Sequence, residues 1–120
     1  MKSMAKNSIC HIEFESTDLA RSQAFYEKMF EWTFRSFGDT MVVFGLGDTH
    51  LGGLQKAEKV TPGRSPSVWV EVDDVDAYLA RVESSGGSIK GGKSLIEGVG
   101  WSAEILDPDG SSLGLVQFER

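Results

Sequence analysis

The chain has 120 residues, 40% of them hydrophobic and 25% charged, which is typical of one globular domain that buries a core. Its 12 Lys and Arg are scattered among 18 Asp and Glu, so the net charge is −6. Nucleic-acid binding needs a basic stripe, and a membrane span needs roughly 18 apolar residues in a row. The sequence has neither feature, so neither a nucleic acid nor a membrane is an expected partner.

Residues 1–6 are positively charged but have no apolar run after them. They therefore lack the pattern of a secretory signal, and we expect a cytoplasmic protein. The acidic balance of the chain suits a neutral or cationic small ligand.

Residues 9–14, Ile-Cys-His-Ile-Glu-Phe, alternate with the period of two that is typical of a strand. One side of this strand is apolar and is expected to pack under a helix, namely Cys10, Ile12 and Phe14. His11 and Glu13 then point to the opposite side. Cys10 is the only cysteine and, in this position, is expected to be an inert, buried thiol.

A helix is predicted directly after this strand. Asp18 or Thr17 is a suitable N-cap, because either side-chain oxygen can accept a free amide of the first turn. Up to Trp32 the sequence then has an approximate apolar stripe, made of Leu19, Phe25, Tyr26, Met29 and Phe30.

Three short strands follow, over residues 32–37, 40–45 and 49–55. The dipeptides between them, Gly38-Asp39 and Gly47-Asp48, supply the positive backbone dihedral that a tight hairpin needs. These strands complete a first module over about residues 8–55. A polar, turn-forming linker is predicted over residues 56–66.

The second half repeats this order over about residues 67–118. Strands are predicted at 68–72, 88–90, 101–106 and 111–118, and a helix at 75–85 ends at Gly86-Gly87. An offset of 56 residues aligns the two openings, placing Asp74 on Asp18, Ser67 on His11 and Trp69 on Glu13. An offset of 62 aligns the two last strands, placing Gly114 on Gly52 and Ser112 on His50. The chain is therefore predicted to be a duplicated βαβββ module of the α+β class.

The two modules together resemble the vicinal oxygen chelate superfamily, which contains glyoxalase I, extradiol dioxygenases and bleomycin-resistance proteins. The resemblance covers about residues 9–118. It is carried by Ile-Cys-His-Ile-Glu-Phe with Asp18-Leu19 and Phe25-Tyr26, by Val-Glu-Val-Asp-Asp-Val-Asp, and by Leu-Asp-Pro-Asp-Gly with Gly-Leu-Val after it. It implies two curved sheets around a cavity in a single domain, a glyoxalase-like fold, and four cavity-facing positions that hold a divalent metal in the enzymes.

In this sequence those four positions correspond to His11, Gly52, Ser67 and Gly114. A catalytic metal needs about three good oxygen or nitrogen donors, and only one imidazole remains. No metal or other cofactor is therefore expected. A displaced divalent-metal site made from His11, His50 and Glu13 is the alternative.

Six residues are candidates for contact with a small organic ligand: His11, Glu13, His50, Ser67, Trp69 and Trp101. His11 is either a neutral structural histidine or a ligand-contacting, acid–base group. Glu13 can orient that imidazole, act as a base, or be a solvated carboxylate at the rim. Trp69 has the parity of Ser67 and is predicted to line the pocket, whereas for Trp101 a pocket position and a core position both stay open.

Two functions follow from these candidates. The first is a metal-free protein that binds a small organic molecule, similar to the bleomycin-resistance members. The second is an enzyme, either a metal-free lyase or isomerase in which His11 and Glu13 are the catalytic acid and base, or a glyoxalase-like or dioxygenase-related metalloenzyme with an irregular site. The resemblance and an open sheet edge also lead us to expect a homodimer.

Overall fold

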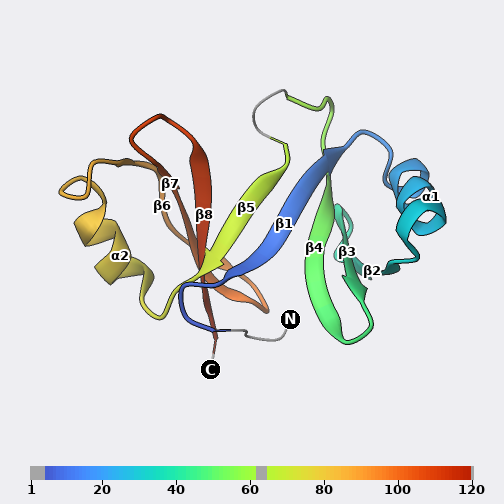
Figure 1. Cartoon of the computed structure of the whole chain (residues 1–120), viewed down its shortest axis with the longest axis horizontal. Coiled ribbons are helices and arrows are strands. Elements are labelled where there is room, and N and C mark those ends of the chain that lie inside the picture. The colour runs from blue at the N-terminus through green and yellow to red at the C-terminus, as the bar shows by residue number, and fades with distance from the viewer. Residues whose placement is uncertain (1–4, 62–64, 120) are drawn as a thin grey trace. The chain divides into compact units, whose positions relative to one another are not determined.

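A computed structural model describes residues 5–61 and 65–119 (Figure 1). Its elements follow the order strand, helix, three strands, and this order occurs twice. The elements are β1 (Ile9–Ser16), α1 (Leu19–Phe30), β2 (Thr33–Phe37), β3 (Met41–Leu46), β4 (Thr49–Lys56), β5 (Ser67–Glu71), α2 (Val75–Val82), β6 (Ser88–Ile96), β7 (Gly100–Leu106) and β8 (Ser112–Phe118). The predicted α+β plan of two βαβββ modules is confirmed. We call β1 to β4 with α1 module one, and β5 to β8 with α2 module two.

The two modules have the same strand order and directions. In module one the order is β2-β3-β4-β1, with β1 parallel to β4 and β3 antiparallel to both of its neighbours. In module two the order is β6-β7-β8-β5, with β5 parallel to β8 and β7 antiparallel to both of its neighbours. When residues are grouped by their contacts, the described residues up to Cys10 fall into one unit with those from Val68 onward. Residues His11–Ser67 form a second unit.

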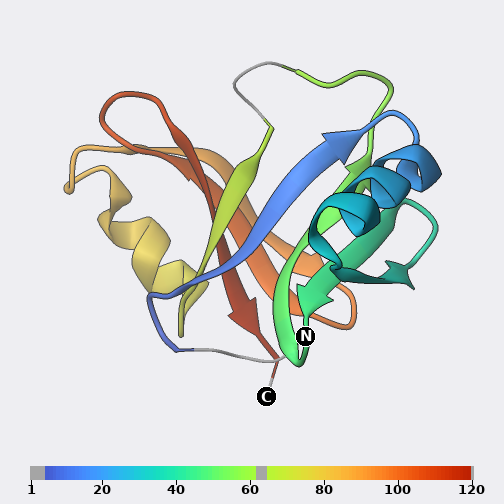
Figure 2. The same cartoon turned by 45° about the vertical axis from the view of Figure 1, so that its right-hand side comes forward.

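Helix α1 begins where the sequence predicts it, because the Asp18 side chain accepts a hydrogen bond from the Arg21 amide at 3.1 Å. It ends at Glu31, whose φ of 57° is left-handed. Figure 2 shows α1 lying across the strands of module one. Beneath it the rings of Trp32 and Phe44 stack with centroids 4.7 Å apart, and Tyr26 stacks on Trp32 at 5.6 Å. The core of module one is therefore largely aromatic.

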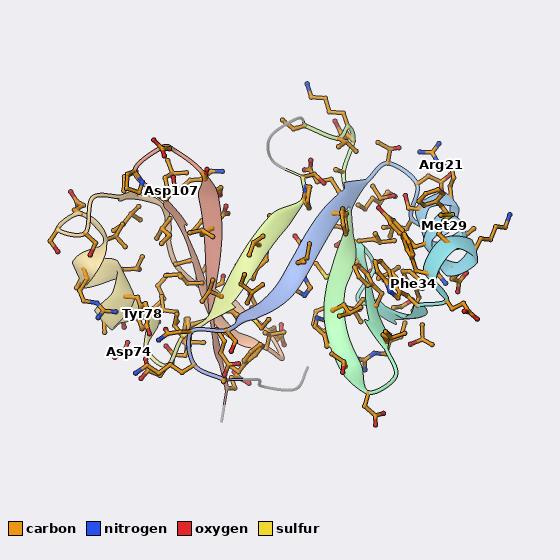
Figure 3. All side chains as sticks on the ribbon, in the orientation of Figure 1. Arg21, Met29, Phe34, Asp74, Tyr78 and Asp107 are labelled. Carbon is orange, nitrogen blue, oxygen red and sulfur yellow. The ribbon has the colours of Figure 1, made fainter. Side chains whose placement is uncertain are left out.

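The predicted apolar stripe of α1 is only partly used for this packing. None of its residues is buried, and three large side chains are about half exposed: Phe25, Met29 (labelled in Figure 3) and Phe30. Ile12 of β1 lies on the predicted side of the sheet but is 39% exposed, so it is only partly covered there. The rings of Phe14, Tyr26 and Phe44 fill the space under the helix instead.

Module two has an aliphatic core. Its helix is capped by Asp74, which accepts from the Ala77 amide at 3.3 Å, and by Gln117, whose Oε1 accepts from the Val75 amide at 2.9 Å. Asp74 and Tyr78 mark this helix in Figure 3. Both Val75 and Val82 are buried, and Val75 packs in a core cluster with Val72, Ala103 and Leu115.

Strand β6 is longer than the predicted segment 88–90, because it continues to Ile96. It is paired on one side with β7 and has two register shifts, and most of its side chains are exposed. An exposed, bulged edge strand lacks the apolar alternation that marks a strand in the sequence, so the pattern could not reveal its full length.

The predicted linker of residues 56–66 is attached to β1 where the structure describes it. The Thr61 amide donates to Glu15 Oε1 at 3.0 Å, and the Glu15 amide donates to Ser65 Oγ at 2.9 Å. Residues 62–64 of this linker, with Pro62-Gly63, lie outside the described residues. Neither helix of the described chain is long and apolar enough to cross a bilayer.

Candidate functional site

The sheet of module one has two different faces. Residues in register on neighbouring strands point to the same side, so Phe14, Leu54 and Phe44 define the face beneath α1. The opposite face carries His11, Glu13 and Gly53, and we call it the histidine face. A Cβ added to Gly53 would lie 3.3 Å from His11 Cε1. The imidazole therefore lies beside a strand position that has no side chain.

This register corrects the prediction for Gly52. Gly52 pairs with Ile12, and its added Cβ would lie 3.0 Å from Phe44 Cζ, on the side of α1. Gly53 is the residue beside His11, one position along the strand. Module two supports this assignment. Leu54 and Leu115 are equivalent buried core residues, and the glycines that directly precede them are Gly53 and Gly114. The offset of 62 for the last strands was thus wrong by one residue.

Three candidate residues of the histidine face form one hydrogen-bonded chain. His11 Nδ1 lies 2.8 Å from His50 Nε2, and His11 Nε2 lies 3.1 Å from Glu13 Oε1. The two imidazoles are nearly parallel, with an interplanar angle of 14°. His11 is buried, whereas Glu13 and His50 are partly exposed. Both ring nitrogens of His11 are therefore used inside the protein.

A β-bulge brings His50 into this chain. On β3, Phe44 pairs with Gly52 and Gly45 pairs with His50, so Leu51 has no partner on that strand. The extra residue reverses the alternation of β4. His50 therefore points to the histidine face although Gly52, two residues later, points to α1. The alignment of the two halves of the sequence predicted the correct side for His50 but for a wrong reason. It placed both His50 and Gly52 on the face opposite α1, as regular alternation requires.

Sequence analysis missed Arg35 on this face. Arg35 of β2 is in register with Val43, which is in register with Gly53. The alternation of Phe34 and Arg35 could have indicated this position, because Phe34 contacts Phe44 on the side of α1. Burial lowers the pKa of His50 from its usual 6.5 to about 4, and the neighbouring His11 and Arg35 add to the effect. His50 is accordingly neutral at neutral pH.

The hydrogen bonds fix a consistent set of proton positions. With Glu13 as a carboxylate, His11 Nε2–H donates to it, and His11 Nδ1 then accepts from Nε2–H of the neutral His50. Nδ1 of His50 is left as an acceptor, and no residue of the described chain donates to it.

The metal that the superfamily implies does not fit these residues. His11 has no free nitrogen, Gly53 and Gly114 have no side chain, and Ser67 offers a neutral hydroxyl. Within residues 5–61 and 65–119, no three His, Cys, Asp or Glu side chains are grouped as a metal site would require.

Module two has a tryptophan where module one has its imidazole and carboxylate. Trp69 is in register with Gly114, and a Cβ on Gly114 would lie 2.2 Å from two carbons of the indole. The ring therefore covers this glycine, at a position where the superfamily places a metal ligand. Trp69 Nε1 is buried without a hydrogen-bond partner among the described residues. Ser67 starts the same strand and shares its parity. We call this surface, with Ser67, Trp69 and Gly114, the tryptophan face.

Trp101 lies on the other side of module two. It packs against the core cluster beneath α2, and Lys93 Nζ lies 4.6 Å above its ring. Trp101 therefore does not share the tryptophan face, and the prediction that it contacts ligand with Trp69 is not supported by its position. It does line a separate surface hollow of about 510 Å³ with Asp73, Gln117, Phe118 and Glu119.

Cys10 is 6% exposed, and its Sγ lies 3.7 Å from the Trp69 carbonyl oxygen. Burial, with a smaller contribution from Glu71, raises its thiol pKa to about 11. A buried thiol that keeps its proton is a poor nucleophile, so Cys10 has a structural role.

Known proteins share this architecture. Residues 8–115 match the model of the Glyoxalase/Bleomycin resistance protein/Dioxygenase superfamily.

A curated relative from Mycobacterium tuberculosis, "Putative glyoxylase CFP32", is 28% identical over 91% of the chain, which spans only 45% of that relative. The hypothetical protein BH1468 from Bacillus halodurans has a TM-score of 0.77 at 12% identity, covering 97% of both chains. The Mn(II)-bound glyoxalase from Novosphingobium aromaticivorans has a TM-score of 0.70 at 18% identity, covering 93% of this chain and 39% of that one. The chain belongs to the Glyoxalase/Bleomycin resistance protein/Dioxygenase superfamily.

Proposed function

We propose that this protein binds a small organic molecule directly on its histidine face, without a resident divalent metal. One observation carries the proposal: both ring nitrogens of His11 are hydrogen-bonded inside the protein, at the position where metal-binding members use a ligand. Among the described residues, the polar groups left for a ligand there include the second carboxylate oxygen of Glu13, Nδ1 of His50 and the guanidinium of Arg35.

The tryptophan face is a separate binding surface of module two, for an aromatic or cationic group. The face of an indole attracts a cation by its quadrupole, with about 0.5–2 kcal/mol. Trp69 also has a buried N–H that lacks an acceptor in the described chain. The net charge of −6 favours a cationic ligand further.

Metal analysis and binding measurements test this proposal. We expect protein purified without chelator to contain far less than one equivalent of zinc, nickel, iron or manganese by mass spectrometry. Benzyltrimethylammonium, an aromatic cation, serves as the probe in calorimetric titrations. Trp69→Ala should weaken its binding to the tryptophan face about tenfold, equivalent to 1.4 kcal/mol, whereas Trp69→Phe, which keeps a ring, should weaken it less. Stoichiometric metal that is lost in His11→Ala or His50→Ala would contradict the proposal.

The second candidate function is enzymatic. The relative CFP32 is named a glyoxylase, and a structural neighbour is a manganese-bound glyoxalase. For this chain, the hydrogen bonds that link His50, His11 and Glu13 favour metal-free acid–base chemistry, as in a lyase or isomerase, over an irregular metal site. Turnover that requires an added divalent metal would reverse this preference.

We further propose that the protein is a homodimer. Three half-exposed apolar side chains on α1, Phe25, Met29 and Phe30, form a surface that an isolated chain would leave in water. Light scattering at micromolar concentration should give twice the mass of one chain. A monomer mass there would contradict the dimer.

A further inference from the structure

A hollow of about 280 Å³ lies in module two between α2, the end of β7 and the start of β8. We call it the α2 hollow. Figure 3 labels two of the residues that line it, Tyr78 on α2 and Asp107 in the turn after β7. It lies on the helix side of the sheet, so it is separate from the tryptophan face. Pockets for drug-sized ligands have about 300–1,000 Å³, so this hollow suits a smaller molecule.

The inner wall of the α2 hollow is apolar and held in place by the fold. Its side chains include Val82, which is buried, and Ile105, which packs against the core cluster beneath α2. Leu113 of β8 adjoins them. The loop after α2 approaches β7 so closely that a Cβ on Gly87 would lie 2.4 Å from the carbonyl oxygen of Leu106. The wall therefore has a fixed shape, and a ligand that covers it removes apolar surface from water.

Arg81 adds a positive charge to this hollow. Its guanidinium lies 4.6 Å from the centroid of the Tyr78 ring, and both residues line the hollow. No salt bridge joins Arg81 to a carboxylate within residues 5–61 and 65–119. A cation–π contact uses the charge of a guanidinium but not its N–H donors. These donors are therefore available to a carboxylate from outside the protein.

The negative groups around the α2 hollow already have hydrogen-bond partners. Asp107 Oδ1 accepts from the amides of Asp109 at 3.0 Å and Ser111 at 2.9 Å. The last carbonyls of α2 accept from the backbone that follows the helix. These hydrogen bonds reduce the negative potential that would repel an anion. Among the described residues, Arg81 is the only one with a positive charge that lines the hollow.

We propose that the α2 hollow binds a small apolar monocarboxylate, whose carboxylate contacts Arg81 and whose hydrocarbon part lies against the inner wall. The planar fork of a guanidinium matches the two oxygens of a carboxylate. An uncharged molecule of the same shape keeps only the apolar contact, and Arg81 repels a cation. Because the ligand is small and Arg81 is exposed, we expect a dissociation constant of about 1 mM. This site uses no residue of the histidine face or the tryptophan face, so it goes beyond the proposed function.

Titration of ¹⁵N-labelled protein with phenylacetate, followed by NMR, tests both the site and its charge preference. We expect saturable shifts of the amide signals of Arg81, Ser85 and Leu106. Phenylacetamide has the same shape without the charge and should bind about fivefold more weakly. Arg81→Gln should weaken phenylacetate about fivefold and leave phenylacetamide unchanged. Arg21→Gln is the matched control, because it changes the net charge equally and lies on α1, and it should leave both affinities unchanged.

Three results would overturn the inference. The first is equal affinity of the wild type for phenylacetate and phenylacetamide, a comparison that depends on no variant. The second is a loss of phenylacetate affinity in Arg81→Gln no larger than in Arg21→Gln. The third is the absence of saturable shifts around the α2 hollow up to about 20 mM phenylacetate, well above the expected dissociation constant. Shifts confined to the histidine face belong to this third result and leave the proposed function intact, which benzyltrimethylammonium tests separately.

Discussion

The two modules have the same plan but place different chemistry on the face opposite the helix. Each lays a ring beside a glycine of the neighbouring parallel strand, His11 beside Gly53 in module one and Trp69 over Gly114 in module two. Module one adds Glu13 and His50 to its ring, whereas module two leaves an indole without a hydrogen-bond partner in the described chain. The duplicated backbone thus gives one titratable surface and one aromatic surface.

The helix-covered faces differ as well. Module one packs stacked aromatic rings under a helix that has no buried residue, whereas module two packs aliphatic side chains under a helix that buries Val75 and Val82. Helix α1 contributes one ring, Tyr26, to a stack whose other rings, Trp32 and Phe44, lie outside the helix. The comparison indicates that α1 contributes less burial than α2, which leaves its apolar side chains free for another contact.

Truncation within the aromatic stack should have the largest effect. Phe44 is 3% exposed and stacks on Trp32, so Phe44→Ala should lower the free energy of unfolding by about 3–5 kcal/mol. Met29→Ala on the exposed side of α1 should change it by less than about 0.5 kcal/mol when both variants are measured at concentrations too low for the proposed dimer. Urea titrations followed by tryptophan fluorescence measure both. If the two variants were equally destabilised, α1 would be buried as deeply as α2 and the contrast would fail.

Filling the two glycines should distinguish the two ring positions. A methyl group on Gly114 would overlap the Trp69 indole, so Gly114→Ala should cost roughly 1–3 kcal/mol and shift the tryptophan emission. The same change at Gly53 meets His11 Cε1 at 3.3 Å and Met41 Sδ at 3.2 Å, and the methionine can adjust. Gly53→Ala should therefore cost less than about 1 kcal/mol. The opposite order, measured by thermal unfolding, would show that the indole moves freely and the imidazole does not.

The smallest expected effect is a dependence of stability on pH that belongs to module one alone. The pKa of His50 is about 4 in the folded chain and 6.5 ordinarily, so between these values the unfolded chain binds more protons. Stability should be greatest above pH 6.5 and fall as the pH decreases, by about 1 kcal/mol at pH 5 once solvent screening is allowed for. His50→Gln should flatten this part of the profile, whereas Trp69→Phe should not. An unchanged slope in His50→Gln would assign the dependence to other groups.

Most of the fold could be predicted from local patterns. Asp18 and Asp74 as N-caps, Gly38-Asp39 and Gly47-Asp48 as turns, and the repeated order of elements are all local signals, and the structure has the elements they predict. Strand β6 was underestimated because its exposed residues have no reason to alternate. Ile12 points to the predicted side but stays partly exposed, because alternation predicts the side to which a residue points and not how far it is covered.

The candidate site was harder to predict, because it depends on register. His11 and Glu13 share a face by simple alternation, which the sequence shows. The contact between His11 and His50 depends on the unpaired Leu51, and the role of Gly53 depends on the pairing of β1 with β4. Neither can be obtained from residue types alone. Trp101 is a further example. The sequence left a pocket position and a core position open for it, and only tertiary packing decides between them.

The bulge at Leu51 has a consequence for how this surface could change over evolutionary time. Loss of that single codon would make β4 regular and place His50 directly before Gly52, so the imidazole would still point away from α1, to the histidine face. All the residues of the His50–His11–Glu13 chain would still be present in the gene, and the strands would still pair. In a lineage of such duplicated modules, a one-residue deletion at the bulge can therefore leave both the fold and the histidine contact in place, and only an alignment that allows a gap there would match His50 with its counterpart.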